Sequence, residues 1–161
     1  MALINQLGNE IPDRWIYPEA GEQGSLGPYR IASFDVLQEF GAVSIEARPA
    51  GILLSPETSP DLLAPFLDQI DLVVIPFPKF RDGRGFTAAR SLRQRHGFMG
   101  DVRAIGHILP DQLLLLAQCG FTSIVTPAEH PPAQWQQASS ASTAEGERPQ
   151  PLLQRLVKRG N

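Results

Sequence analysis

Most of the side chains that could do chemistry lie in one short segment, residues 77–90. The segment follows an apolar run, Leu72–Ile75, and leads into a helical pattern. Basic side chains and glycines between a strand and a helix suit the binding of an anion or an acidic partner. The candidate ligands are Lys79, Arg81, Gly83, Arg84, Gly85, Thr87 and Arg90, and the charged Arg103 is added from a later strand.

Two residues are candidates for proton transfer, Asp82 and His107. Asp82 belongs to an Asp-Gly pair, which equally favours a turn whose carboxylate bonds its own backbone or a nearby arginine. His107 follows a predicted strand, where an imidazole can donate a proton or bind an anion. Arg103 either reaches an acid such as Asp101 or Asp111, or points toward the site. No histidine–carboxylate spacing indicates a metal site, and no cofactor is assigned.

The glycines of the segment do not form a standard nucleotide motif. A P-loop requires glycine-lysine followed by serine or threonine, and the chain has no such sequence. Residues 83–88 match the G-x-G-x-x-A spacing of dinucleotide folds. However, they start too far beyond the strand, and the acid expected about 20 residues later is absent.

Charge is concentrated in the same region. Residues 79–96 hold six basic side chains and one acid, which gives a net charge of +5. Since the whole chain has a net charge of −3, the remaining residues carry −8. A basic island in an acidic protein favours a local anion site, or simply a solvated arginine-rich helix face. It argues against general nucleic-acid binding, which needs a broadly basic domain.

Composition indicates a globular protein. Hydrophobic residues make up 42% of the 161-residue chain. No apolar run approaches the roughly 20 residues that cross a bilayer, and the N-terminus lacks signal-peptide features, so we expect a cytoplasmic protein. The single cysteine, Cys119, excludes an internal disulfide and is expected to be a buried structural thiol.

Strands and helices are predicted to alternate from residue 51 onward. Ser59 and the following proline mark one helix start, and Gly97 and Gly120 end two later helices. Upstream, Ser33 is expected to cap a helix that Gly41 ends, and the alternation of 43–47 predicts a strand. The predicted strands of the repeating part are 51–54, 72–77, 102–105 and 123–125.

This alternation predicts an α/β fold. Short strand–helix–strand connections require parallel strands with right-handed crossovers, and uninterrupted apolar strands indicate that both sheet faces are covered. We therefore expect a mostly parallel sheet with helices on both faces, doubly wound as in Rossmann or flavodoxin-like proteins. A partial (β/α) barrel is the alternative. In such sheets ligands bind beyond the carboxyl ends of the strands, where residues 76–86, 106–109 and 126–129 should meet.

Three regions are expected along the chain. Residues 1–50 form an irregular segment with short strands and one short helix, and residues 51–128 form the α/β core. In 129–161, the Gln-, Ser- and Pro-rich residues 134–151 are predicted to be a flexible linker. The apolar stripe that follows, Leu152 to Val157, fits a helix that docks on the domain or on a second subunit, as in a homodimer. It fits a disordered basic tail equally well.

The core resembles the DUF934 family of bacterial proteins. The resemblance rests on three ordered pieces, residues 77–93, 100–106 and 119–121, together with Asp111-Gln112. Members are often described as oxidoreductases involved in sulfite reduction, because their genes lie beside those of sulfite reductase and sulfate-activation enzymes. The resemblance therefore implies a pathway rather than a reaction. The chain departs from the family pattern at Pro76, His107 and Pro110.

Two functions fit these observations, and whether the protein is an enzyme stays open. In the first, the protein is auxiliary to assimilatory sulfite or sulfate reduction, and its basic loop binds an anionic small molecule with a sulfur oxyanion or a phosphate. In the second, it is a non-catalytic docking partner of sulfite reductase or of an acidic electron carrier. Neither function involves nucleic acid or a membrane.

Overall fold

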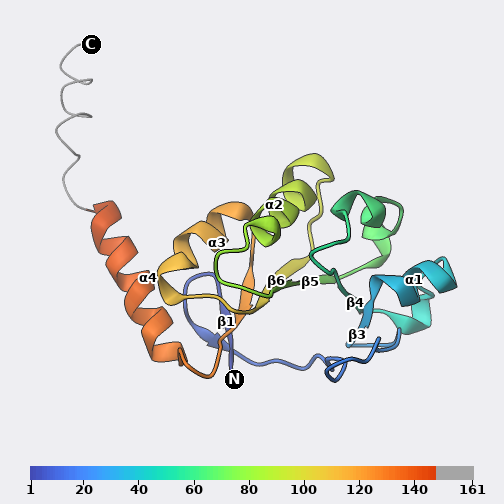
Figure 1. Ribbon diagram of the computed structural model, residues 1–161, viewed down its shortest axis with the longest axis horizontal. Helices are drawn as coiled ribbons and strands as arrows, with labels where there is room; N and C mark the ends of the chain where they lie inside the picture. Colours follow the sequence, from blue (N-terminus) through green and yellow to red (C-terminus); the bar gives the residue numbers. More distant parts are fainter. Residues whose placement is uncertain (148–161) are drawn as a thin grey trace, which may run out of the picture.

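A computed structural model describes residues 1–147, which build one seven-stranded sheet in the order β2-β1-β7-β6-β5-β4-β3 (Figure 1). Strands β3 to β7 are parallel to one another, whereas β1 runs antiparallel to both β7 and β2. The prediction of an α/β fold with a mostly parallel sheet is confirmed. The strands are β1 (Leu3–Asn5), β2 (Glu10–Ile11), β3 (Arg30–Ser33), β4 (Ala50–Leu53), β5 (Leu72–Phe77), β6 (Asp101–Gly106) and β7 (Ser123–Val125).

The helices connect these strands and cover one face. Strands β3 to β7 are added in one direction without a reversal, so right-handed crossovers all pass over the same face. A (β/α) barrel also winds in one direction, but this sheet stays open, with β2 and β3 at its edges. The helical elements are α1 (Phe34–Phe40), η1 (Ile45–Ala47), η2 (Pro60–Gln69), α2 (Arg84–Arg90), η3 (Ser91–Arg95), η4 (Pro110–Gln112), α3 (Leu113–Cys119) and α4 (Pro132–Glu147).

The other face is covered by the irregular N-terminal segment, which differs from the expected helices on both faces. There Trp15 and Tyr17 pack against a small cluster of Ile31, Leu72 and Val74. Figure 1 shows this blue segment running along the side of the sheet away from α2 and α3. Because alternate residues of a strand face opposite ways, both faces of β5 are buried, as its apolar run predicts.

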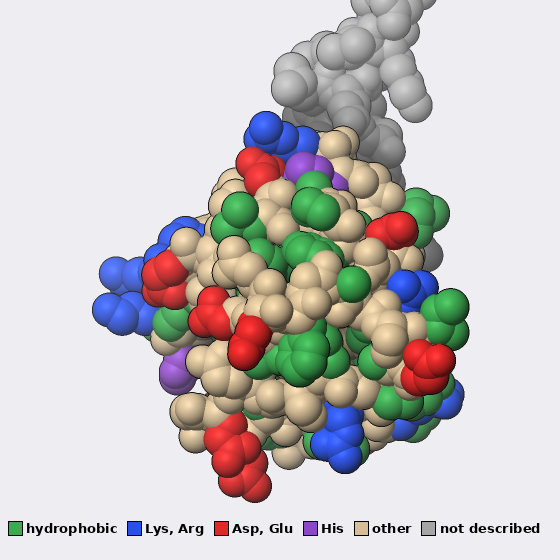
Figure 2. All heavy atoms as spheres, turned by 90° about the vertical axis from the view of Figure 1, so that its right-hand side faces the viewer, with side chains coloured by type: hydrophobic (Ala, Val, Ile, Leu, Met, Phe, Trp, Pro, Cys, Tyr) green, Lys and Arg blue, Asp and Glu red, His purple; other side chains and the backbone are tan. Residues whose placement is uncertain are grey.

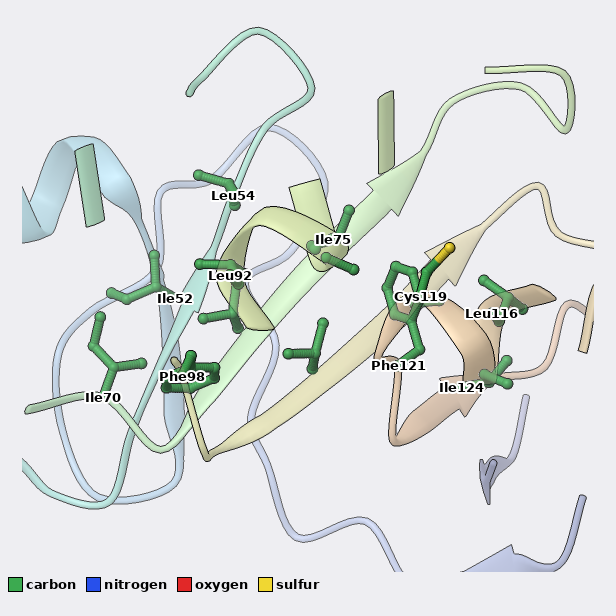
Figure 3. Packing of buried hydrophobic residues seen from close by; sticks show 14 of the residues in the cluster. Ile52, Leu54, Ile70, Ile75, Leu92, Phe98, Leu116, Cys119, Phe121 and Ile124 are labelled. Carbon is green, nitrogen blue, oxygen red and sulfur yellow. The ribbon is translucent and has the colours of Figure 1, made fainter. Parts of the chain in front are cut away.

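The main core lies between the sheet and the helices. Ile75 of β5, Leu92 of η3 and Phe121 before β7 are among its largest fully buried side chains. In the view of Figure 3, Ile75 lies between Leu92 and Phe121, and Cys119 lies beside Phe121. Cys119 is 2% exposed, as expected for a structural thiol.

Local signals place several boundaries as predicted. Ser33 accepts a hydrogen bond from the Val36 N–H, and Gly41 ends α1 in the left-handed conformation. The Ser59 side chain caps η2, but η2 has the tighter 3₁₀ geometry over its whole length, and Pro65 lies inside it. Proline removes a backbone donor and clashes with the preceding turn, so it disfavours a regular α-helix there.

Two predictions of secondary structure are wrong. Residues 43–47 form no strand: Val43 is buried, but Ile45 starts the 3₁₀ turn η1 and is 78% exposed. The expected linker is largely helical, because α4 spans Pro132–Glu147 and packs on α3 and η4. The predicted stripe from Leu152 to Val157 lies outside the described residues. None of the helices within residues 1–147 has the length and apolar content to span a bilayer.

Candidate functional site

A cleft of about 700 Å³ lies beyond the carboxyl ends of β4 and β5. One wall is the loop after β4 with the start of η2, and the other is α2 with the first turn of η3. Parallel sheets commonly bind ligands at this edge. The lining residues that the sequence predicted are Gly83, Arg84, Gly85 and Thr87, and the added polar ones are Ser55, Glu57, Thr58, Ser59, Asp61, Ser91 and Arg95.

Gly83 and Gly85 have different roles in this cleft. A Cβ at Gly83 would meet no atom within 4 Å, so this glycine leaves the cleft open. A Cβ at Gly85 would lie 2.5 Å from the ring of Phe77, which is buried in the core. Gly85 is therefore needed for close packing of α2 on β5 rather than for approach of a ligand.

The Asp82 carboxylate is hydrogen-bonded to Arg84, the first residue of α2. Its carboxylate accepts hydrogen bonds from the Arg84 backbone N–H at 3.1 Å, from Nε at 2.9 Å and from Nη2 at 2.6 Å. Through these bonds Arg84 lowers the pKa of Asp82 to about 2. A carboxyl group with this pKa stays ionised at neutral pH and is a weak base. The structure thus gives Asp82 the local turn role that the Asp-Gly pair favours.

We expect the Asp82 carboxyl to titrate near pH 2 in the folded protein, and Arg84→Ala to return its pKa toward 3.8. Since the folded-state pKa is depressed, the contribution of this contact is present above pH 4 and is lost as pH falls toward 2. Side-chain carbonyl NMR shifts across this pH range measure both values. An unchanged Asp82 midpoint in the variant would show that Arg84 is not the cause.

The cleft is lined by both basic and acidic side chains, which form long, exposed ion pairs. Arg84 Nη1 lies 3.8 Å from Glu57, and Arg95 Nη1 lies 3.5 Å from Asp61. Asp61 also lies 2.7 Å from His96 Nε2, and this hydrogen bond lowers the Asp61 pKa. Exposed ion pairs of this kind are screened by solvent and contribute little to stability, so an incoming anion can replace them at small cost.

A π-helical turn, η3, positions two residues of the cleft wall that α2 and η3 form. The His96 N–H donates to the Ser91 carbonyl at 3.2 Å, five residues back, which widens the helix by one residue. Ser91 and Arg95, at the two ends of this turn, both line the cleft. Single π turns are rare and are frequent at functional sites.

His107 does not reach the cleft. It lines a separate hollow of about 290 Å³ beyond the ends of β5, β6 and β7, with Phe80, Leu109, Glu129 and His130 among the other walls. The His107 backbone N–H donates to the Phe77 carbonyl at 2.8 Å, which joins the ends of β5 and β6. The two candidate proton-transfer residues, Asp82 and His107, are therefore not brought together.

The remaining cations of the basic island have separate environments. Lys79 and Arg81 are exposed on the loop between β5 and α2, and Arg90 faces α3, where Nη2 lies 3.3 Å from Cys119 Sγ. Arg93 donates to the carbonyls of Gly120, Phe98 and Gly100. Arg93 is thus part of the framework and not of a free basic face.

The structure places Arg103 away from the cleft, on the opposite face of the sheet. It is 3% exposed and donates to Tyr17 at 2.7 Å, Ser123 at 2.8 Å, Asp101 at 3.0 Å and Asp13 at 3.3 Å. The sequence predicted that Arg103 either contacts an acid such as Asp101 or points toward the site, and the structure shows the contact with Asp101. Alternate strand residues face opposite ways, so Arg103 points away from its neighbours Val102 and Ala104, which lie in the main core.

The sequence analysis missed the hydroxyl-rich wall of the cleft. Ser55, Thr58 and Ser59 follow the end of β4, and the Ser55 and Thr58 hydroxyls lie 3.0 Å apart. The rule that ligands bind beyond carboxyl ends, applied to β4 as well as β5, would have found this loop. Arg95 could be found only from the π turn, which the local sequence does not mark.

The sequence profile of DUF934, bacterial proteins of unknown function, matches residues 51–148. The match covers more than half of the 161 residues and includes both walls of the cleft, so the chain belongs to this family. A search of curated proteins found no match.

Proposed function

We propose that the protein is an accessory of sulfite or sulfate reduction that binds an organic molecule carrying a sulfate or phosphate group in the cleft. The observation that carries this proposal is the lining of the cleft, which combines Arg84 and Arg95 with the hydroxyls of Ser55, Thr58 and Ser59. Guanidinium groups and hydroxyls are the side chains that oxyanions most often contact.

Arg84 supports the proposal because one edge of its guanidinium is held in place and the other is accessible. Asp82 binds Nε and Nη2, which fixes the plane of the group. Nη1 points toward Glu57, whose side chain is 74% exposed and 3.8 Å away. An oxyanion can take the place of Glu57 without breaking the Asp82 contact. Such preorganisation reduces the entropy lost on binding.

The size of the cleft favours an organic anion over a bare ion. A water molecule takes about 30 Å³ in the liquid, so sulfite or sulfate would fill only a small part of the cleft. Sites for small organic ligands are on the order of 300–1,000 Å³. Pro56, Pro60 and Ala88, which are partly exposed, also line the cleft and offer apolar surface to a ring or chain. A nucleotide-linked sulfate has both the anion and the ring.

The family resemblance supports a place for this ligand in sulfur metabolism. Members are described as encoded beside enzymes of sulfate activation and sulfite reduction, which handle sulfur oxyanions. An accessory role fits better than catalysis, because Asp82 is bound by Arg84 and His107 lies in another hollow. The protein would then bind or hold an intermediate of this pathway rather than convert it.

We expect adenosine 5′-phosphosulfate and AMP to bind in isothermal titration calorimetry, and Arg84→Ala to weaken binding about tenfold. This factor corresponds to the loss of a charge-assisted hydrogen bond, about 1.5 kcal/mol. Arg90→Ala is the matched control, because Arg90 carries the same group on α2 but faces α3. Adenosine, which lacks the anion, should not bind. Absence of binding at millimolar nucleotide, or equal effects of the two substitutions, would contradict the proposal.

A further inference from the structure

We propose that the loop 78–82, between β5 and α2, is a docking site for an acidic protein. This loop lies outside the cleft, and the inference is independent of the ligand proposed above. The loop carries an aromatic side chain, Phe80, between two cations, Lys79 and Arg81. Aromatic residues and arginine are the side chains most enriched at the energetic centres of protein interfaces.

Phe80 exposes an apolar ring that the fold does not use. It is 47% exposed, although large apolar side chains are stabilised by burial. The Arg81 guanidinium lies over this ring, 5.5 Å from its centre. Among residues 1–141, whose side chains the structure describes, neither Lys79 nor Arg81 lies within 4 Å of a carboxylate, although Arg84 and Arg95 nearby both do. The Lys79 charge acts on Asp82 only as one of several causes that lower the Asp82 pKa. Both cations are therefore available to acids of a partner.

The loop is held in one conformation. The Asp82 N–H donates to the Lys79 carbonyl at 3.0 Å, and the Gln112 side chain donates to the Phe80 carbonyl at 3.1 Å. Gln112 is itself fixed, because its Oε1 accepts from the Leu109 N–H at 2.9 Å. A preordered loop loses little entropy when a partner binds, so its contacts contribute more fully to affinity.

A receiving hollow lies beside the exposed ring. Phe80 forms one wall of the hollow of about 290 Å³, whose other walls include the apolar Leu109 and Pro127 and the polar His107, Glu129 and His130. This volume accommodates a single side chain of a partner rather than a large ligand. An apolar side chain in the hollow would bury Phe80, while acidic neighbours of that side chain reach Lys79 and Arg81.

The positive charge of this loop favours an acidic partner, in contrast to another exposed apolar surface of the protein. At the edge formed by α1 and η1, Phe40 and Ile45 are 70% and 78% exposed. Figure 2 views this side and shows apolar side chains in the middle with acidic ones close by. That segment contains Asp35, Glu39 and Glu46, so its charge is opposite to that of the docking loop. Complementary charge speeds encounter and excludes like-charged proteins.

The test uses a fluorescein-labelled peptide that alternates glutamate with leucine, titrated with the full-length protein at low ionic strength. We expect saturable binding that weakens as salt is raised, and about tenfold weaker binding for Phe80→Ala and for Arg81→Ala. Phe40→Ala and Arg30→Ala are matched controls, because they remove an exposed ring and an exposed cation elsewhere. Circular dichroism of each variant verifies that the fold is kept.

Three results would overturn the proposal. The first is equal weakening by Arg30→Ala and Arg81→Ala with no effect of Phe80→Ala, which indicates diffuse charge attraction. The second is tighter binding of a single-stranded DNA oligonucleotide than of the acidic peptide, which indicates a nucleic-acid site. The third is absence of peptide binding at low salt. Selective loss in Phe80→Ala and Arg81→Ala supports docking through this loop.

Discussion

Replacing Arg103 by alanine is expected to lower the free energy of unfolding by about 3 kcal/mol. Arg103 crosses from β6 to the N-terminal segment, where it bonds Asp13 and Tyr17. It also bonds Asp101 and Ser123 within the sheet. These contacts join residues about 90 positions apart in the sequence, and they cover the face of the sheet that has no helices.

The cost arises mostly from the partners that the substitution leaves behind. Asp13 and Asp101 would keep their negative charges without the buried cation between them. The Tyr17 hydroxyl would lose the Arg103 donor at 2.7 Å and keep its bond to Asp13. Burial raises the pKa of Tyr17 above its ordinary value, so the phenol stays a neutral group that needs a hydrogen-bond partner. Removing one member of a buried ionic network costs more than the network contributes as a whole.

Guanidinium denaturation followed by circular dichroism measures this loss. Tyr17→Phe removes two hydrogen bonds, one to Asp13 and one from Arg103, and should cost about 1–2 kcal/mol, because Arg103 keeps its acids. Arg30→Ala, an exposed arginine on β3, should change stability by less than about 0.5 kcal/mol. If Arg103→Ala costs no more than Arg30→Ala, the network does not hold the N-terminal segment on the sheet.

The fold was largely predictable because its signals are local. Ser33 and Gly41 cap α1, Ser59 and Pro60 start η2, and the apolar run of β5 requires two buried faces. The way in which the N-terminal segment covers the helix-free face of the sheet was not predictable from local signals. Trp15 and Tyr17 reach it from an irregular segment, and only tertiary contacts show where such a segment lies.

The region of the candidate site was predictable, but which side chains come together in it was not. The loop after β5 was found because glycines and cations follow a strand. Sequence order could not show that the start of α2 turns toward the loop after β4, whereas His107 lies beyond β6 in another hollow. Arg84 and His107 are therefore separated, although both follow adjacent strands of one sheet.

Trp135→Ala is expected to lower the free energy of unfolding by about 3–5 kcal/mol, because the indole is fully buried. The composition of α4 did not indicate a helix, because its Gln, Ser and Ala residues are typical of a linker. Trp135 anchors α4 by packing in the core, and its indole N–H donates to the His130 carbonyl at 2.9 Å. Gln136→Ala, an exposed neighbour, is the matched control and should change stability by less than about 0.5 kcal/mol. Denaturation followed by circular dichroism compares the two variants. Equal stabilities would mean that α4 does not contribute to the folded domain. A large loss confined to Trp135→Ala would establish that the core extends beyond residue 128.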